Sequence, residues 1–442
     1  MLLCLLQVIL LMITVFSYSF GRRELTFPPF LFSLGFAVST ACAIAMAPAW
    51  GLSIRINTFI VLVAGATLFT VCACCIHVLF FKRKGGGDLE AAPKVSTLPL
   101  DVRILPLLFA LGIQIIVLLG MLYFVSNWYP EVDLFTALGR YKEALTFSTQ
   151  APSFPFPLKQ LVNFDKAAGY VFAFLLAECV ELKHWKKASI CAANVLLVAF
   201  LGLVVGGRFL ALSYPFMAFV ILMLLRYRNE VTRLPRSMII SVICFGAVFV
   251  LMFQMLSFGR SGSLSFFEYL SIYLGAPISN LNHYLQLENL GGSIPFGRMT
   301  FYCLYTYIGL KFGITEWQYN FDLPFLSSNG FSMGNVYTTY YSFLYDFGYV
   351  GLIVLVVVMA TISQFVYEKA RRGTGKFQDL WILFSAFISY QLIFSFFSDK
   401  FYEEIVSPGF ITMSVYLLIA RYFLCHFNIR EFASKGFSKG AE

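Results

Sequence analysis

Residues 189–225 read SICAANVLLVAFLGLVVGGRFLALSYPFMAFVILMLL, a stretch in which Arg208 is the single charged residue. It is too long for one ordinary membrane span, and Gly206, Gly207 and Arg208 divide it into two runs of about 17 residues. A helix of that length extends about 26 Å, slightly less than the hydrocarbon core of a bilayer. The stretch therefore predicts a helical hairpin whose tip, at Arg208, lies at the outer membrane interface.

The rest of the chain has the same character. Its 442 residues are 59% hydrophobic and 12% charged, with a mean hydropathy of +0.78. A soluble domain carries about twice that charged fraction. Apolar runs of roughly 17–25 residues recur from end to end, as membrane-crossing helices require, whereas the strands of a membrane barrel would alternate apolar and polar residues. The sequence therefore predicts an all-α polytopic membrane protein.

The apolar runs predict about eleven spans, with the N-terminus outside and the C-terminus inside. Roughly two thirds of the 32 Lys and Arg residues then fall in the inner segments, as the positive-inside rule requires. The same rule explains the net charge of +9 better than nucleic-acid binding does. The predicted spans are 2–20, 27–47, 57–81, 104–125, 164–182, 189–205, 209–225, 237–257, 346–368, 379–397 and 405–425.

This arrangement makes residues 1–442 a single membrane domain with two long outer loops, 126–163 and 258–345. Loops of that length inside a compact protein are usually functional or disordered. The second loop is too rich in aromatic and aliphatic residues to be disordered, so we expect it to form a partly folded cap. Residues 266–287 are expected to form a helix along the membrane surface, which Pro277 should kink or break.

Outer arginines are the first candidates for a binding site, because few ionisable residues fall near the middle of a span. At Arg208, a guanidinium between glycines and the membrane surface suits a phosphate, and a side chain that snorkels to lipid headgroups is the alternative. Arg260 and Arg298 also follow glycines in the long loop, where a solvated loop charge is the more ordinary role.

Further candidates lie in the same loop. His283 has the chemistry of a general base, and a structural histidine is the alternative. Asp346 could be a base or could cap the ninth span. Tyr337, Tyr340, Tyr341 and Tyr345 are expected to form an interfacial aromatic belt, and stacking on sugars is the functional alternative. We find no zinc spacing, phosphate-binding loop or nucleotide-binding motif, and therefore predict no metal and no cofactor.

Three segments in the second half together resemble the Wzy-type oligosaccharide repeat-unit polymerases, the O-antigen and capsule polymerases of bacterial inner membranes. The resemblance covers about residues 200–360 and depends on the order and placement of the motifs. The segments are Gly206-Gly207-Arg208, then Tyr273-Leu274-Gly275-Ala276-Pro277-Ile278-Ser279-Asn280-Leu281-Asn282, and finally Gly334-Asn335-Val336-Tyr337-Thr338 followed by Asp346-Phe347-Gly348-Tyr349-Val350-Gly351.

The resemblance implies a multi-pass glycosyltransferase of the bacterial inner membrane, with a GT-C-like bundle and periplasmic loops at 126–163 and 258–345. Such enzymes polymerise undecaprenyl-diphosphate-linked oligosaccharides, without a nucleotide sugar or a metal. Membrane lipids, a chain-length regulator and a flippase are the expected partners, and nucleic acid is not. By the same resemblance, Arg208, Arg260 and Arg298 would hold diphosphates. The catalytic set is expected to be Arg208, Arg298, His283 and Asp346, and Asn335, Tyr337 and Tyr340 are expected to contact substrate.

Other functions remain open at this point. An O-antigen ligase shares the architecture but attaches the glycan to the lipid A core. A flippase for the lipid-linked repeat unit would need a polar cavity through the bundle, which the scarcity of charged residues within the spans disfavours. A purely structural membrane protein would leave the outer arginines and the long cap unexplained.

Overall fold

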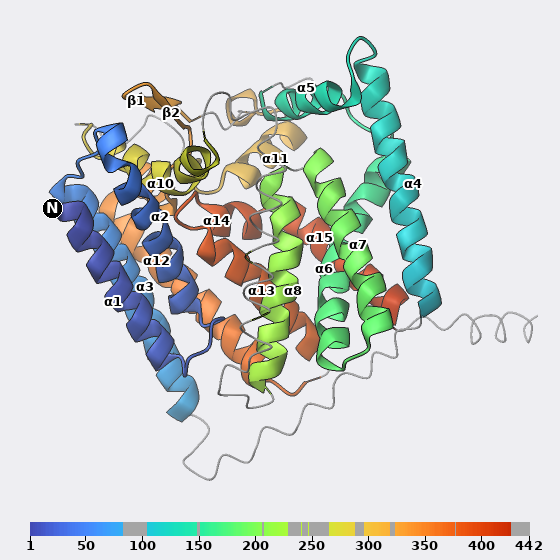
Figure 1. Ribbon diagram of the computed structural model, residues 1–442, viewed down its shortest axis with the longest axis horizontal. Coiled ribbons are helices and arrows are strands. Elements are labelled where there is room, and N and C mark those ends of the chain that lie inside the picture. Colours follow the sequence, from blue (N-terminus) through green and yellow to red (C-terminus); the bar gives the residue numbers. More distant parts are fainter. Residues whose placement is uncertain are drawn as a thin grey trace, which may run out of the picture. The chain divides into compact units, whose positions relative to one another are not determined.

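The computed structural model describes residues 1–82, 104–147, 151–205, 207–228, 240, 246, 265–287, 296–318, 323–375 and 377–425. The described part is mostly α-helical, and seven of its helices are long and apolar enough to cross a membrane. These seven are α1 (Leu2–Phe20), α2 (Pro28–Trp50), α3 (Ile56–Lys82), α4 (Ile104–Trp128), α7 (Trp185–Val205), α8 (Arg208–Arg228) and α12 (Thr339–Arg372) (Figure 1). The prediction of a multi-helix membrane protein is confirmed at this level.

Three further helices coincide with predicted spans: α6 (Phe156–Glu181), α13 (Gln378–Ile393) and α15 (Pro408–Cys425). The predicted span 237–257 lies almost wholly outside the described residues. The total number of spans and the GT-C-like bundle therefore stay predictions. The apolar stretch 189–225 does form two helices, since α7 ends at Val205 and α8 begins at Arg208, with Gly207 at a φ of 81°.

The chain divides into two compact units, where the sequence predicted a single membrane domain. Unit 1 comprises residues 1–94, 146–149 and 219–410, and unit 2 comprises residues 95–145, 150–218 and 411–442. In unit 1, α1 packs on α2 and α3, while α12 packs on α3 and α13. The second predicted loop, 258–345, lies entirely within unit 1, and the first, 126–163, lies mostly in unit 2.

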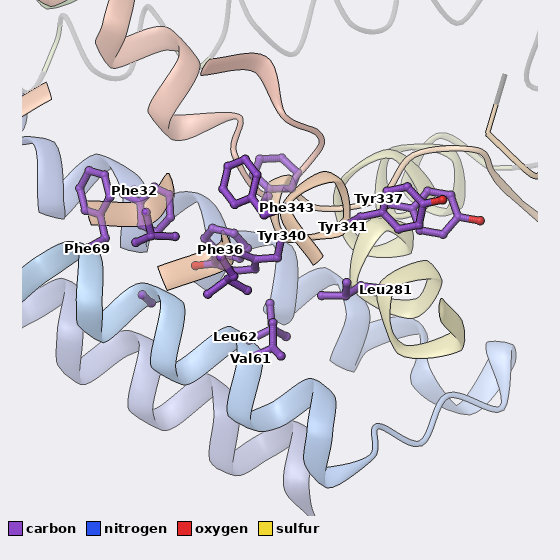
Figure 2. Packing of buried hydrophobic residues seen from close by; sticks show 14 of the residues in the cluster. Phe32, Phe36, Val61, Leu62, Phe69, Leu281, Tyr337, Tyr340, Tyr341 and Phe343 are labelled. Atoms are coloured by element: carbon purple, nitrogen blue, oxygen red, sulfur yellow. The ribbon is translucent and has the colours of Figure 1, made fainter. Parts of the chain in front are cut away.

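Aromatic rings form the centre of the unit 1 core. The rings of Phe32 and Phe69 stack at 4.2 Å, and those of Phe36 and Tyr340 stack at 5.2 Å. Figure 2 shows Tyr340 pointing toward Phe36. Tyr337 and Tyr341 lie farther to the right in this view, above Leu281. The Tyr340 ring needs a glycine opposite it, because a Cβ built on Gly65 would lie 2.4 Å from the Tyr340 ring. Packing between helices distant in sequence thus fixes α12 against α2 and α3.

The described part of the second loop is folded. It contains α10 (Phe266–Tyr284), α11 (Tyr302–Phe312), the 3₁₀ turn η1 (Thr315–Trp317) and a hairpin of β1 (Leu326–Ser328) and β2 (Phe331–Gly334). The hairpin turns at Asn329 and Gly330, both at positive φ, as a two-residue Asn-Gly turn requires. The fold therefore includes two short strands that the all-α prediction did not contain.

A helix is confirmed over most of the expected range 266–287, as α10, and its place along the membrane surface stays a prediction. Its first turn carries a capping box, in which the Ser265 side chain and the Glu268 side chain each bond the other's backbone N–H. The helix continues through Pro277, so the expected break does not occur. Packing explains this, because Gly275 lies so close to α2 that an added Cβ would be 2.8 Å from the Ala43 nitrogen. One face of α10 is thus buried on α2.

A buried ion cluster lies at the C-terminal end of α12, formed by Glu24, His77, Glu368, Arg371 and Arg372. His77 Nδ1 bonds Glu368 Oε1, and Arg372 Nε lies 2.9 Å from Glu368 Oε2. Arg371 Nε lies 3.0 Å from Glu24 Oε1. The Glu368 side chain is 0% exposed, so these contacts replace its hydration. The cluster ties α12 to α3 and to the segment that joins α1 and α2.

Unit 2 is built on α4, α6 and α7, and α5 (Leu134–Phe147) packs its Tyr141 ring 5.4 Å from that of Trp128. α6 and α7 meet closely at Gly169, where a Cβ would lie 2.7 Å from Val198. Asp165, on α6, is 2% exposed. Within the described residues its Oδ2 atom has no hydrogen-bond partner, which is uncommon for a buried polar atom.

Candidate functional site

A tight turn carries Arg298 in front of α11. Gly297 adopts a φ of 79°, and an added Cβ would lie 3.0 Å from the rings of Phe301 and Phe347. The Asp346 carboxylate holds this turn, since it accepts the backbone N–H of Met299 at 3.2 Å and that of Thr300 at 2.6 Å. These two bonds place Arg298 directly beside the residues that flank Asp346 on α12.

The helix that carries Asp346 is interrupted two residues later. Gly348 has φ 64° and ψ −159°, a conformation that is essentially restricted to glycine. α12 therefore consists of a short outer segment, Thr339–Phe347, and a long segment, Tyr349–Arg372. Gly351 completes the corner, because a Cβ there would overlap the Phe347 side chain at 1.9 Å. The predicted start of the ninth span, at Asp346, therefore lies two residues before the break in α12.

Tyrosines line one side of the short segment of α12. The ring of Tyr341 lies 4.5 Å from that of Tyr337 and 5.8 Å from that of Tyr345, the spacing of one helical face. Tyr284, at the end of α10, meets Tyr341 edge-on at 4.5 Å. Burial raises the pKa of the Tyr284 hydroxyl, and the nearby Tyr345, Asp346 and Tyr349 raise it further. We call Tyr284, Tyr341, Tyr345 and Tyr349 the tyrosine cluster.

Arg298 and the tyrosine cluster form one region. The hydrogen bonds from Met299 and Thr300 to Asp346 bring the Arg298 turn next to Tyr345, and the guanidinium is close enough to act on Tyr345 electrostatically. Arg298 and Tyr345 are both half-buried, and Tyr349 is 49% exposed. The arrangement presents a fixed cation beside aromatic rings, which suits an anionic ligand with an amphipathic neighbour.

Two asparagines of α10 support this region. Asn280 donates to the carbonyl groups of Met333 and Val336, at 3.2 and 2.8 Å. Asn282 accepts from the Arg55 backbone and the Thr58 hydroxyl. The Tyr273–Asn282 and Gly334–Thr338 segments, two of the three that carry the family resemblance, are therefore in direct contact in the structure.

The predicted site residues separate into three groups. Arg298 and Asp346 lie together, and His283 is exposed on the last turn of α10, next to Tyr284. Asn335 is half-buried beside the hairpin. Arg208 begins α8 in unit 2, its side chain lies outside the described part, and Arg260 lies outside the described residues altogether. Their expected roles stay predictions.

The two predicted tyrosines are both buried. Tyr340 is 0% exposed and stacks on Phe36, so no face of its ring is open to a sugar. Tyr337 is 4% exposed and donates from its hydroxyl to the Pro324 carbonyl at 3.1 Å. Burial also raises the pKa of Tyr337 to about 12. The more exposed aromatic surface is supplied by Tyr345, which the sequence analysis weighed for sugar stacking, and by Tyr349, which it did not single out.

Acidic residues of the short helix α14 (Lys400–Ile405) lie on another side of α11. Asp399 caps α14 and accepts the Thr339 hydroxyl at 3.3 Å, and burial raises the pKa of its carboxyl group well above the ordinary value. Lys400 Nζ lies 2.6 Å from Glu403 Oε2. Burial, and then Glu403, raise the pKa of the Cys303 thiol to about 12, so this thiol stays protonated and unreactive.

Within the described part of the chain, no three His, Cys, Asp or Glu side chains are grouped so that they could hold a metal ion. No family model matches the chain, and neither a curated protein nor a solved structure matches it.

Proposed function

We propose that the protein is a membrane glycosyltransferase that polymerises lipid-linked oligosaccharide repeat units. In this proposal it transfers a glycan from undecaprenyl diphosphate to the terminal sugar of a second lipid-linked unit, at the periplasmic face of a bacterial inner membrane. The acceptor hydroxyl attacks the anomeric carbon, the bond from that carbon to the diphosphate oxygen breaks, and the acceptor proton passes to a base. The product is O-antigen or capsular polysaccharide.

The observation that carries the proposal is the fixed position of Arg298. Asp346 holds the backbone of the Arg298 turn through two hydrogen bonds, so the point from which the guanidinium extends is set before substrate arrives. A diphosphate leaving group gains negative charge in the transition state, and a preorganised cation stabilises that charge. Arg298 is therefore assigned to a diphosphate oxygen, beside a surface that can accept sugar.

The distribution of charge supports the same orientation. The long segment of α12 ends in Lys369, Arg371 and Arg372, which the positive-inside rule assigns to the cytosol. Arg298 and Asp346 lie at the opposite end of that helix, on the outer side. A lipid carrier whose chain lies in the outer leaflet would place its diphosphate at the membrane surface, where this proposal puts Arg298 and Asp346.

Two alternatives use the same substrate. A ligase would pass the glycan to the lipid A core, and a flippase would move the lipid-linked unit without cleaving it. The resemblance to repeat-unit polymerases favours polymerisation over ligation. A flippase would need a polar path through the helix bundle, and the sequence places few ionisable residues near the middle of its predicted spans.

The test is the surface glycan of a host strain that lacks the gene and carries each variant. Arg298→Ala should leave core plus a single repeat unit and no ladder on a lipopolysaccharide gel (for a capsule, on an immunoblot). Losing one such contact typically costs about 3–4 kcal/mol, or several hundredfold in rate. Arg298→Lys keeps the charge but loses the two-pronged geometry, so the ladder should be weak.

Arg140→Ala is the matched control, because this arginine is exposed on α5, in unit 2. It should give a full ladder at equal protein level. A full ladder from Arg298→Ala would remove Arg298 from the active site. Unmodified core in the strain that lacks the gene would contradict polymerisation itself and favour the ligase or flippase.

A further inference from the structure

Tyr345 and Tyr349 are the two members of the tyrosine cluster that remain accessible to solvent. Tyr345 is half-buried, and its ring stacks on Tyr341 at 5.8 Å with 28° between the planes. Tyr349 is 49% exposed. Both lie on the side of α12 that faces Tyr284, and not on the side of Tyr340 and Phe36, where the core packs. Their rings are available to a ligand.

We propose that Tyr345 and Tyr349 form a stacking platform for the sugar ring that is linked directly to the diphosphate. The inference rests on the proposed function and names the part of the substrate that this surface binds. The sequence offered sugar stacking as an alternative role for Tyr337, Tyr340, Tyr341 and Tyr345. The first three of these rings are buried, so the proposal keeps Tyr345 and adds Tyr349.

The geometry matches the chemistry of such a substrate. A sugar diphosphate places an anion and a pyranose ring within a few bonds of each other. A pyranose has an apolar face of C–H groups and a rim of hydroxyl groups, which suits an aromatic ring that carries its own hydroxyl. The Met299 and Thr300 bonds to Asp346 hold the backbone of the Arg298 turn beside the helical segment that carries Tyr345, so the two binding elements extend from neighbouring points of the backbone.

The buried residues beneath Tyr345 and Tyr349 distinguish a sugar-binding platform from an aromatic belt that faces lipid. Tyr341 is 6% exposed and Tyr284 is 5% exposed, so the second layer of the tyrosine cluster is solid protein. Tyr345 is therefore held by its neighbours and loses little rotational freedom on binding, which favours affinity. An interfacial tyrosine of a membrane belt would have no need of a buried aromatic layer or of an adjacent fixed guanidinium.

The experiment measures binding to the full-length protein in nanodiscs, with two probes. The first is farnesyl diphosphate, and the second is farnesyl diphosphate that carries one N-acetylglucosamine. Wild type should bind the sugar-bearing probe more tightly. Tyr345→Leu and Tyr349→Leu should each weaken that probe about five- to tenfold and leave farnesyl diphosphate unchanged, as expected for loss of one aromatic contact. Tyr345→Phe keeps the ring and should keep most of the preference.

Tyr307→Leu is the control, because Tyr307 is 46% exposed on α11 and lies outside the tyrosine cluster. An unchanged preference in both leucine variants would overturn the platform, and the diphosphate assignment would survive if Arg298→Ala weakened both probes. Equal weakening of both probes by Tyr345→Leu would indicate contact with the lipid chain and would also overturn the platform. A wild-type protein that binds neither probe would overturn the proposed function as well.

Discussion

Removal of the Glu368 carboxylate should destabilise unit 1 strongly. Glu368→Ala would leave His77 and Gln364 without the acceptor that both use, and Arg372 without its counterion. The His77 side chain is only 9% exposed, whereas that of Arg372 is 22% exposed and can be hydrated in part. Breaking a buried ion pair from one side typically costs about 3–5 kcal/mol, and the burial of His77 indicates a value within that range.

The assay is thermal unfolding of the purified protein in detergent at a fixed scan rate, because membrane proteins seldom refold after heating. At roughly 2–4 °C per kcal/mol for chains of moderate size, and less for longer ones, the melting temperature should fall by about 5–10 °C. Glu316→Ala is the control, since Glu316 is exposed in η1 and its removal should shift the melting temperature by no more than about 1 °C.

A double substitution separates the ion pair from simple packing. Replacing both members of a buried pair by apolar residues of similar volume is often neutral or stabilising. His77→Leu combined with Glu368→Met should therefore recover much of the stability that Glu368→Ala loses. If Glu368→Ala had the same melting temperature as Glu316→Ala, the reasoning would be refuted. That result would show that the ion cluster is hydrated, whereas the structure has it buried.

Two further substitutions probe close packing and an isolated buried acid. Gly275→Ala should lower the melting temperature by several degrees, because the new Cβ would press on the α2 backbone at Ala43, and overpacking typically costs about 1–3 kcal/mol. Gly112→Ala, with no atom within 4 Å of the new Cβ, should be neutral or stabilising, and equal effects of the two would contradict this account. Asp165→Leu should raise the melting temperature, because the buried Asp165 Oδ2 atom has no hydrogen-bond partner among the described residues and an unsatisfied buried polar atom costs about 1–3 kcal/mol. A lower melting temperature would show that Asp165 has a stabilising contact.

Local features of the fold could be predicted from the sequence. The two glycines at 206 and 207 mark the boundary between α7 and α8, and the Asp346-Phe347-Gly348 segment marks the point where α12 changes direction. Ser265 and Glu268 have the spacing of a capping box at the start of α10. The hairpin was missed although Asn329-Gly330 is a strong turn signal, because its strands are too short for an alternating pattern.

Features that depend on contacts between distant segments could not be predicted. Tyr340 reads as one more interfacial tyrosine until Gly65 and Phe36 are seen to enclose it. Asp346 reads as a helix cap or a base, and its actual partners are backbone groups 46 and 47 positions earlier in the chain. The His77–Glu368 pair joins residues 291 positions apart, and no spacing rule relates them. Of the four predicted catalytic residues, only Arg298 and Asp346 are in demonstrated proximity.

The break at Gly348 also sets a depth in the bilayer. Backbone that departs from helical geometry leaves carbonyl and amide groups unpaired, and hydrocarbon cannot solvate them, so such a break needs water or protein around it. Gly348 and Glu368 are 20 positions apart, or about 30 Å along a helix, which is about the thickness of a hydrocarbon core. The long segment of α12 thus has a polar feature at each end, and the distance between these two features matches the thickness of the hydrocarbon core. If α12 spans a bilayer with Gly348 and Glu368 at its two surfaces, a bilayer several ångströms thicker or thinner would change the tilt of the helix, and we expect the Arg298 turn to respond to lipid chain length.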